Sequence, residues 1–321
     1  MAWVRRISGW LLPFVLTVLA FADAPPEKLL AQGRVDEAIA ALQQKTSAAP
    51  NDAESYNLLC RAYFSMGQWD RGIPNCEKAT QLDPNNGRYH LWLGRIYGEK
   101  ADASGFFTAA GLVGKVRTEF EAAVRLSPES ADAHSDLAEF YLEAPGIVGG
   151  GRDKAEAQAQ ILDRLDPAKA HYIRGRIDEK KKDRAAAERE YRAAIEATHG
   201  SALTWFNLAL FYRHHQEYDQ MEEAVKHAVA APMDSPEVMV ESAEILIRAG
   251  RSYQAAADLL RRYLASDDKV EEAPAFKAHY LLGTALEKEG NKQGAVKEYT
   301  AALALARNYS RAQEALSQVS R

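Results

Sequence analysis

The residues with the clearest chemical potential form a short glycine-rich stretch ahead of two cations: Gly146, Gly149, Gly150, Gly151, Arg152 and Lys154. Successive backbone N–H groups at the start of a helix can hold a phosphate. A nucleotide loop also needs the ending GK[ST] after a strand, which GIVGGGRDK lacks. Asp153 with Glu156 is typical of a helix N-cap and capping box, which would occupy those N–H groups. We therefore expect a connector here, and no cofactor.

Two cysteines, Cys60 and Cys76, are the candidates for thiol chemistry. Their spacing forms no CxxC redox motif. In an oxidising compartment they could form a disulfide, yet paired helices often hold such Cα atoms beyond the roughly 7 Å limit for that bond. The sequence leaves two alternatives, a disulfide and a pair of buried thiols.

A metal site is suggested by four neighbouring residues: His214, His215, Glu217 and His227. Adjacent histidines on a helix point about 100° apart, and neither H-x-x-x-H nor H-E-x-x-H occurs in the sequence. We expect a solvated helix end without a metal. Because G-x-S-x-G and catalytic-cysteine signatures are also missing, we expect no catalytic residues and a protein that is not an enzyme.

The first residues predict export. Arg5 and Arg6 precede an apolar stretch and an Ala-Phe-Ala site with cleavage before Asp23, the pattern of a signal peptide over residues 1–22. The apolar stretch is shorter than the roughly 20 residues of a spanning helix, although an uncleaved anchor is the alternative. We expect a periplasmic or secreted protein with no stable membrane insertion after signal cleavage.

The charge balance argues against nucleic acid as a partner. The chain has 40 Lys and Arg against 45 Asp and Glu, which gives a formal net charge of −5. Its longest single-sign run is the lysine triplet at residues 180–182. Such a sequence lacks the basic patch by which proteins bind nucleic acid.

A repeat predicts the elements that must position these residues. A small residue recurs with steps of 34, 44, 37, 34, 34 and 40, at Cys60, Gly94, Ala138, Gly175, Ala209, Ala243 and Gly283. A second segment with an early alanine follows each time. Prolines close several units, at Pro50, Pro84, Pro128 and Pro167. This period predicts stacked helical hairpins and almost no strand.

The pattern resembles the tetratricopeptide repeat, a helix-turn-helix unit. The second unit carries it as Tyr56, Leu59, Cys60, Tyr63, Gly72, Cys76, Ala79 and Pro84, and the sixth as Trp205, Leu208, Ala209, Tyr212, Val225 and Ala228. The resemblance implies an all-α fold, a right-handed superhelical solenoid whose neighbouring hairpins bury a continuous core. The chain is similar to exported bacterial repeat proteins of unassigned activity.

We predict about eight repeats over residues 23–309, the first one truncated, and a C-terminal capping helix over residues 310–321 with a polar outer face. The longer steps place insertions near residues 101–114 and 144–152. The first insertion, ADASGFFTAAGLVGK (101–115), is apolar. It forms either a short extra helix on the core of the array or a docking element for a partner or a lipid.

The resemblance also implies where a ligand binds, on a concave groove lined by the first helix of each repeat. Carried over by register, the groove contains Asn57, Arg61, Phe64, Trp92, Arg95, Tyr172, Arg176, Phe206, Arg213 and Tyr280. Arginines and aromatic residues are frequent anchors of protein interfaces, and a solvated surface is the alternative.

We therefore expect a non-catalytic scaffold of the bacterial cell envelope that binds a protein or peptide in this groove. A carrier of lipid or small molecules that uses residues 101–115 is the alternative, and an enzyme is a remote one.

Overall fold

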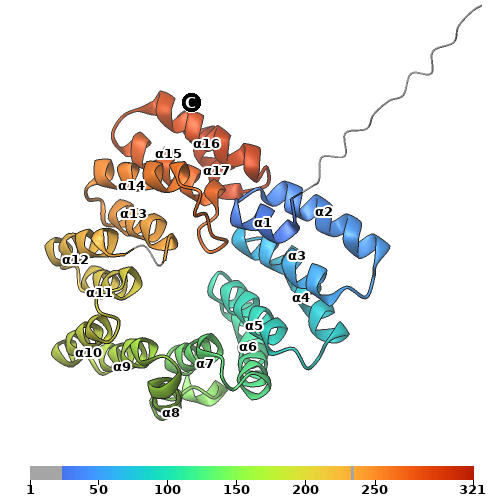
Figure 1. Cartoon of the computed structure of the whole chain (residues 1–321), viewed down its shortest axis with the longest axis vertical. Coiled ribbons are helices and arrows are strands. Elements are labelled where there is room, and N and C mark those ends of the chain that lie inside the picture. The colour runs from blue at the N-terminus through green and yellow to red at the C-terminus, as the bar shows by residue number, and fades with distance from the viewer. Residues whose placement is uncertain (1–23, 233–234) are drawn as a thin grey trace, which may run out of the picture.

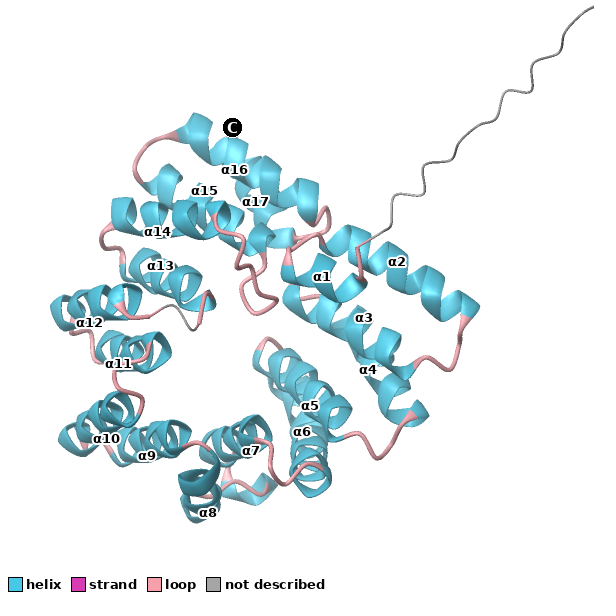
Figure 2. Cartoon of the chain, viewed as in Figure 1, coloured by secondary structure: helices cyan, strands magenta, loops and turns pink. Residues whose placement is uncertain are grey.

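The computed structural model describes residues 24–232 and 235–321. The predicted signal peptide, residues 1–22, lies outside the described residues. Within them the chain forms α-helices and one short 3-10 helix, with no strand (Figure 2). The all-α fold predicted from the repeat is confirmed.

Eight helical hairpins and a final helix follow one another along the described chain. The hairpins are α1 (Pro26–Ala31) with α2 (Val35–Ala48), α3 (Ala53–Ser65) with α4 (Trp69–Leu82), α5 (Gly87–Asp102) with α6 (Phe106–Leu126), α7 (Ala131–Glu143) with α8 (Arg152–Leu165), α9 (Pro167–Lys181) with α10 (Arg184–Ala197), α11 (Ala202–His214) with α12 (Tyr218–Ala230), α13 (Glu237–Ala249) with α14 (Tyr253–Ala265), and α15 (Ala275–Lys288) with α16 (Lys292–Leu305). The 3-10 helix η1 (Gly146–Val148) connects α7 to α8, and α17 (Ser310–Val319) follows α16.

Local sequence signals start the helices and turn the chain between them. The side chains of Asp52, Ser130 and Asp183 each accept a hydrogen bond from the backbone N–H three residues later. Each of these caps satisfies a donor that the first helical turn leaves free. Gly67 and Gly290 adopt φ angles of 69° and 84° in the turns within their hairpins, a conformation that glycine adopts without steric cost.

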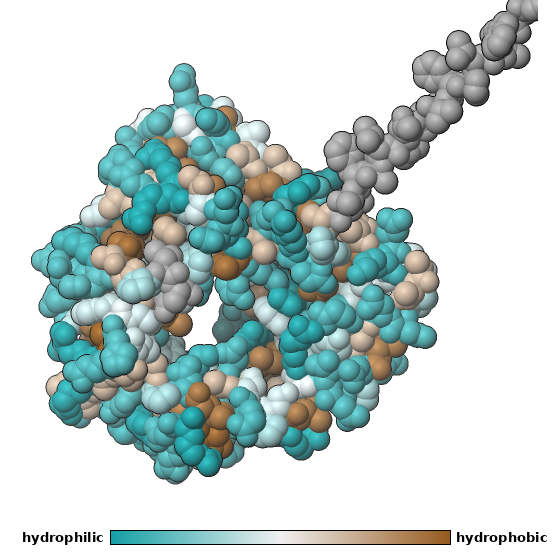
Figure 3. Space-filling view, viewed as in Figure 1, coloured by the Kyte–Doolittle hydropathy of each residue, from teal (hydrophilic) through white to brown (hydrophobic). Residues whose placement is uncertain are grey.

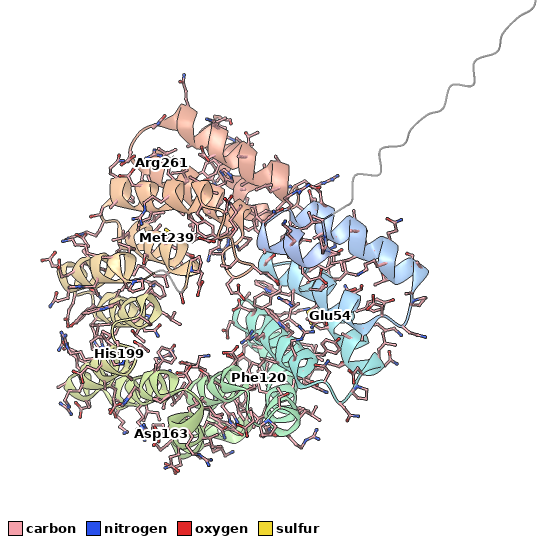
Figure 4. The ribbon with its side chains drawn as sticks, viewed as in Figure 1. Glu54, Phe120, Asp163, His199, Met239 and Arg261 are labelled. Carbon is pink, nitrogen blue, oxygen red and sulfur yellow. A yellow bond between two sulfur atoms is a disulfide. The ribbon has the colours of Figure 1, made fainter. Side chains whose placement is uncertain are left out.

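The recurring small residue lies where the two helices of a hairpin are closest. A Cβ atom added to Gly94 would lie 2.5 Å from the ring of Phe120 on α6, which Figure 4 labels. A Cβ atom on Gly283 would lie 2.5 Å from the ring of Tyr299 on α16. The contact that requires the small residue is therefore with an aromatic ring of the second helix.

The hairpins curve until the two ends of the array meet (Figure 1). One buried apolar cluster joins α1, α2 and α3 to α15, α16 and α17, with Leu29, Leu30, Leu58, Leu59, Tyr63, Phe276, Ala302, Tyr309 and Ala312 among its members. At Gly33, in the turn between α1 and α2, an added Cβ atom would overlap the backbone nitrogen of Ala275. The array is thus a closed ring. We call the boundary between residues 24–68 and residues 266–321 the seam.

The final helix does not leave the end of the array facing solvent. Ala312 on α17 and Tyr309, which precedes it, are buried in the cluster that crosses the seam. The other side of α17 is polar and exposed, with Arg311, Gln313, Glu314 and Gln318 on it. A linear array needs a polar cap because its last hairpin has no neighbour, whereas closure gives this one a neighbour.

The extra residues near 101–114 lengthen a helix and form no separate one. Helix α6 has 21 residues, whereas α4 and α12 have 14 and 13. Phe106 and Phe107, at its start, are 80% and 89% exposed. The aromatic side chains of Phe106 and Phe107 therefore do not pack onto the core of the array.

The glycine stretch is an elongated turn whose N–H groups are occupied. The N–H groups of residues 149–151 all donate to backbone carbonyls of α7 or of the same loop. Gly151 is the N-cap of α8 and provides no side-chain cap. The capping box predicted from Asp153 and Glu156 was wrong, because the helix already begins at Arg152. The N–H groups of these three glycines are therefore already engaged in hydrogen bonds within the loop and to α7.

Candidate functional site

The inner surface of the ring is the candidate binding surface. Figure 1 shows α7, α9, α11 and α13 nearer the centre than α8, α10, α12 and α14. The space-filling view shows an opening through the middle of the ring (Figure 3). The first helix of these hairpins therefore faces the opening, as expected for the groove-lining helices.

An aromatic and arginine cluster lies on this surface beside the seam. The guanidinium carbons of Arg61 and Arg95 lie 5.0 Å and 4.9 Å from the ring centroid of Trp92. The ring of Phe64 meets that of Trp92 edge to face, with centroids 5.4 Å apart. Cations at such distances are attracted to the face of an indole ring. All four side chains are partly exposed, so a ligand can reach them.

Three arginines of the predicted groove, Arg61, Arg95 and Arg176, are paired with carboxylates of neighbouring repeats. Arg61 donates two hydrogen bonds to Glu271, at 2.8 Å and 2.5 Å, across the seam. Arg95 on α5 donates to Asp136 on α7 at 2.5 Å. A third pair joins α9 to α7, where Arg176 contacts Glu139 and Glu143, both at 2.8 Å.

These pairs hold the inner helices in place at a cost in desolvation. Burial raises the pKa of Asp136 and of Glu139, and this effect outweighs the attraction of Arg95 and Arg176. A carboxylate withdrawn from water becomes harder to ionise, so the net stability from such pairs is small and their geometric role is larger. An acidic ligand group would have to displace a carboxylate that is already in place.

Phe64 lines two of the cavities that open beside the cluster. One of about 530 Å³ lies between α5, α6 and α7 and is lined by Val113, Val116, Phe120 and Phe140 among others. The second, of about 560 Å³, is lined from one side of the seam by Arg61 and Trp92 and from the other by Pro274, Lys277, Tyr309 and Arg311. We call the second one the seam cavity.

The structure sorts the remaining predicted groove residues into accessible and buried ones. Tyr172, Arg213 and Tyr280 are partly exposed on α9, α11 and α15. Asn57 is fully buried, and Phe206 is 6% exposed in the core of its hairpin. The prediction that these two line the groove was wrong. Helical register gives the side of a helix, but the packing of neighbouring helices decides whether that side is covered.

Sequence reasoning missed the C-terminal residues of the site. Glu271, Lys277, Tyr309 and Arg311 share the seam cavity with Arg61, although Glu271 is 210 residues away in the chain. The repeat pattern contains no signal for this juxtaposition. It depends on how far the whole array curves.

The cysteines and histidines take structural positions. Cys60 and Cys76 form a disulfide between α3 and α4, with Cα atoms 5.2 Å apart. His214 and His215 approach Glu179 at 3.6 Å and 3.8 Å, whereas His227 stacks on Trp205. No group of three or more potential metal ligands occurs among the described residues, and within them no helix is both long and apolar enough to cross a bilayer.

Comparison with known families agrees with this architecture. Two models of the tetratricopeptide repeat match the chain, over residues 29–73 and 240–312. Together with the succession of helical hairpins, these matches define the class: the chain is a tetratricopeptide repeat protein. No curated protein matches it.

Solved structures with a similar fold include the yeast Tom70 crystal structure, which is 12% identical with a TM-score of 0.54 over 89% of this chain and 58% of that one. The Cut9–Hcn1 hetero-tetramer of the APC/C is 14% identical, with a TM-score of 0.41 over 92% of this chain and 54% of that one. A tetratricopeptide repeat protein from Parabacteroides merdae is 15% identical, with a TM-score of 0.42 over 84% and 99%. The chain matches little more than half the length of the first two. The likeness to Tom70 supports the fold alone.

Proposed function

We propose that this protein is a non-catalytic scaffold of the cell envelope that binds a protein or peptide on the inner surface of its ring. The observation that carries the proposal is the partly exposed cluster of Trp92, Phe64, Arg61 and Arg95 beside the seam cavity. Tetratricopeptide repeats generally serve as interaction scaffolds, and aromatic and arginine side chains dominate the binding energy of protein interfaces.

Site-specific photo-crosslinking tests the location of binding. A photoreactive phenylalanine analogue replaces Phe64 on the inner surface, and in a control variant it replaces Lys297, which is exposed on α16. After irradiation of intact cells that make the protein, we expect adducts of defined mass from position 64 only. Equal adducts from both positions, or adducts from position 297 alone, would place the partner elsewhere.

The envelope location is supported by the pattern of residues 1–22 and by the disulfide between Cys60 and Cys76. Disulfides persist in oxidising compartments and are rare in the cytosol. N-terminal sequencing of the protein from its own cells should give Asp23 as the first residue. Retention of Met1 would indicate an anchor in place of a cleaved signal.

A carrier of lipid or small molecules is a second candidate, favoured by the apolar residues at the start of α6. Phe106 and Phe107 are exposed there, and Val113 and Val116 further along the helix line the cavity of about 530 Å³. Native mass spectrometry of the protein purified from its own envelope separates the candidates. Co-purified lipid without a peptide would support the carrier and contradict the scaffold.

A further inference from the structure

We propose that the ring opens at the seam while its repeats stay folded, so that a polypeptide segment can enter the central opening from the side and be enclosed when the seam closes. This inference rests on the proposed function, because it describes how a ligand reaches the same inner surface. It concerns one boundary of the ring, and the other boundaries between repeats stay closed.

The seam differs from every other boundary between the described hairpins because no linker spans it. Elsewhere a short loop joins consecutive hairpins, and between α8 and α9 the single residue Asp166 ends one helix and caps the next. At the seam, residues 24–68 meet residues 266–321 through noncovalent contacts alone. Loss of these contacts separates the two ends, whereas the loss of contacts elsewhere leaves neighbours tethered.

A small set of polar contacts fixes the seam beside its apolar cluster. Arg61 holds Glu271 through two hydrogen bonds. Asp36 accepts from both the backbone and the side chain of Arg307, at 3.0 Å and 2.9 Å. The side chain of Gln68 donates to the carbonyl of Asn308 at 2.7 Å. Salt and water compete with such contacts more easily than with buried apolar ones.

Closure leaves the carboxylate of Glu271 in unfavourable surroundings. Its side chain is 15% exposed and is held by Arg61 across the seam. Burial raises the pKa of Glu271 despite this pairing, because a carboxylate withdrawn from water is harder to ionise. Opening would return the carboxylate to water, which recovers part of the free energy that closure costs.

A ligand in the seam cavity contacts both sides of the boundary. Arg61 and Trp92 line it from one side, and Tyr309 and Lys277 from the other. A ligand that binds all four stabilises the closed ring relative to the open one, because it binds the closed state more tightly. A segment that enters from the side passes through the open seam, and closure then retains it.

Distance measurement between paired spin labels tests the opening without a ligand. The native cysteines are bonded to each other, so labels attach to introduced thiols. One pair, Gln44→Cys with Lys297→Cys, spans the seam. A control pair, Gln160→Cys with Arg189→Cys, spans the boundary between α8 and α10. All four positions are exposed. We call these the seam pair and the interior pair.

We expect the seam pair to show a second, longer distance that gains population at high salt, while the interior pair keeps a single distance. Arg61→Gln should increase the longer population, because it leaves the carboxylate of Glu271 without its charged donor, as should Gly33→Ala, which places a methyl group against Ala275. Gly290→Ala is the matched control, because Gly290 has the same kind of φ and nothing within 4 Å of an added Cβ. It should leave the seam pair unchanged.

One short distance for the seam pair at every salt concentration, and in both Arg61→Gln and Gly33→Ala, would overturn the proposal. Circular dichroism checks that each variant retains its helix content. A seam that stays closed would contradict the proposed opening and would leave the proposed function untouched. A ring that never opens could still crosslink to a partner through position 64.

Discussion

Two boundaries of the ring use the same contacts but are connected differently. Between α7 and α9, Arg176 contacts Glu139 and Glu143, which are 37 and 33 residues away in sequence. At the seam, Arg61 contacts Glu271 from 210 residues away. Both are arginine–carboxylate pairs with small exposure. The comparison teaches that the contacts of Arg176 adjust the curvature of a tethered array, whereas the contact of Arg61 with Glu271 helps to close it.

The largest effect is expected in the core of an interior hairpin. Tyr191 on α10 is 2% exposed, and its ring packs against Gly175 on α9. Tyr191→Ala should lower the free energy of unfolding by about 3–5 kcal/mol, because it leaves a cavity that the helices cannot fill. Urea denaturation monitored by circular dichroism measures this loss.

The matched control keeps the ring and removes only its hydroxyl. That hydroxyl donates to the carboxylate of Glu179 at 2.7 Å, so Tyr191→Phe should cost about 1.5–3 kcal/mol. If Tyr191→Ala lowers the free energy of unfolding no more than Tyr191→Phe does, the aromatic side chain of Tyr191 does not stabilise the interior hairpin. The contrast with the seam then disappears.

The next effect is expected at the closest backbone approach of the seam. Gly290→Ala should cost about 1–2 kcal/mol through its positive φ alone. Gly33→Ala has the same strain and also overlaps Ala275, so it should cost about 1–3 kcal/mol more. The measurements are urea denaturation and the seam-pair distance. Equal losses in the two variants, with no change in that distance, would mean that Gly33 does not take part in closure.

A smaller effect separates the two arginine pairs. Arg61→Gln and Arg176→Gln should each lower stability by about 1–2 kcal/mol, because each leaves a partly buried carboxylate without its charged donor. Only Arg61→Gln should lengthen the seam-pair distance. The comparison would fail if Arg176→Gln opened the seam to the same extent, since the two boundaries would then be coupled.

The smallest effect is a pH dependence of closure. Burial raises the pKa of Glu271 above its ordinary value of 4.5 in the closed ring, where Arg61, Glu272 and Glu54 are the charged groups around it. The closed ring then binds the proton more tightly than the open one, so closure is favoured as the pH falls toward the raised pKa. Below the ordinary value both states are protonated and the effect ends.

The seam pair should therefore show less of the longer distance at pH 5 than at pH 7.5. Glu271→Gln has no titrating group at this position and should remove the difference. A pH dependence that persists in this variant would assign it to another group.

The sequence predicted the hairpins well because their signals are local. Gly94 and Gly283 mark the closest approach within a hairpin, and each meets the aromatic ring of its second helix. Helical register was also sufficient to identify four groove residues that are partly exposed: Arg61, Phe64, Trp92 and Arg95. The burial of Asn57 could not be predicted from register, because it depends on neighbouring helices. The capping box was misplaced because sequence signals locate a helix end only to within one or two residues.

The sequence by itself determined an all-α array of tetratricopeptide repeats, since hydrophobic spacing and small residues act within one or two hairpins. It also placed two extra segments within the array. Only the tertiary structure decided that the array closes. Closure depends on the sum of small rotations between successive hairpins, and no single repeat determines that sum. The same sum brings Glu271 and Tyr309 beside Arg61 and Trp92, which makes the candidate site a property of the ring.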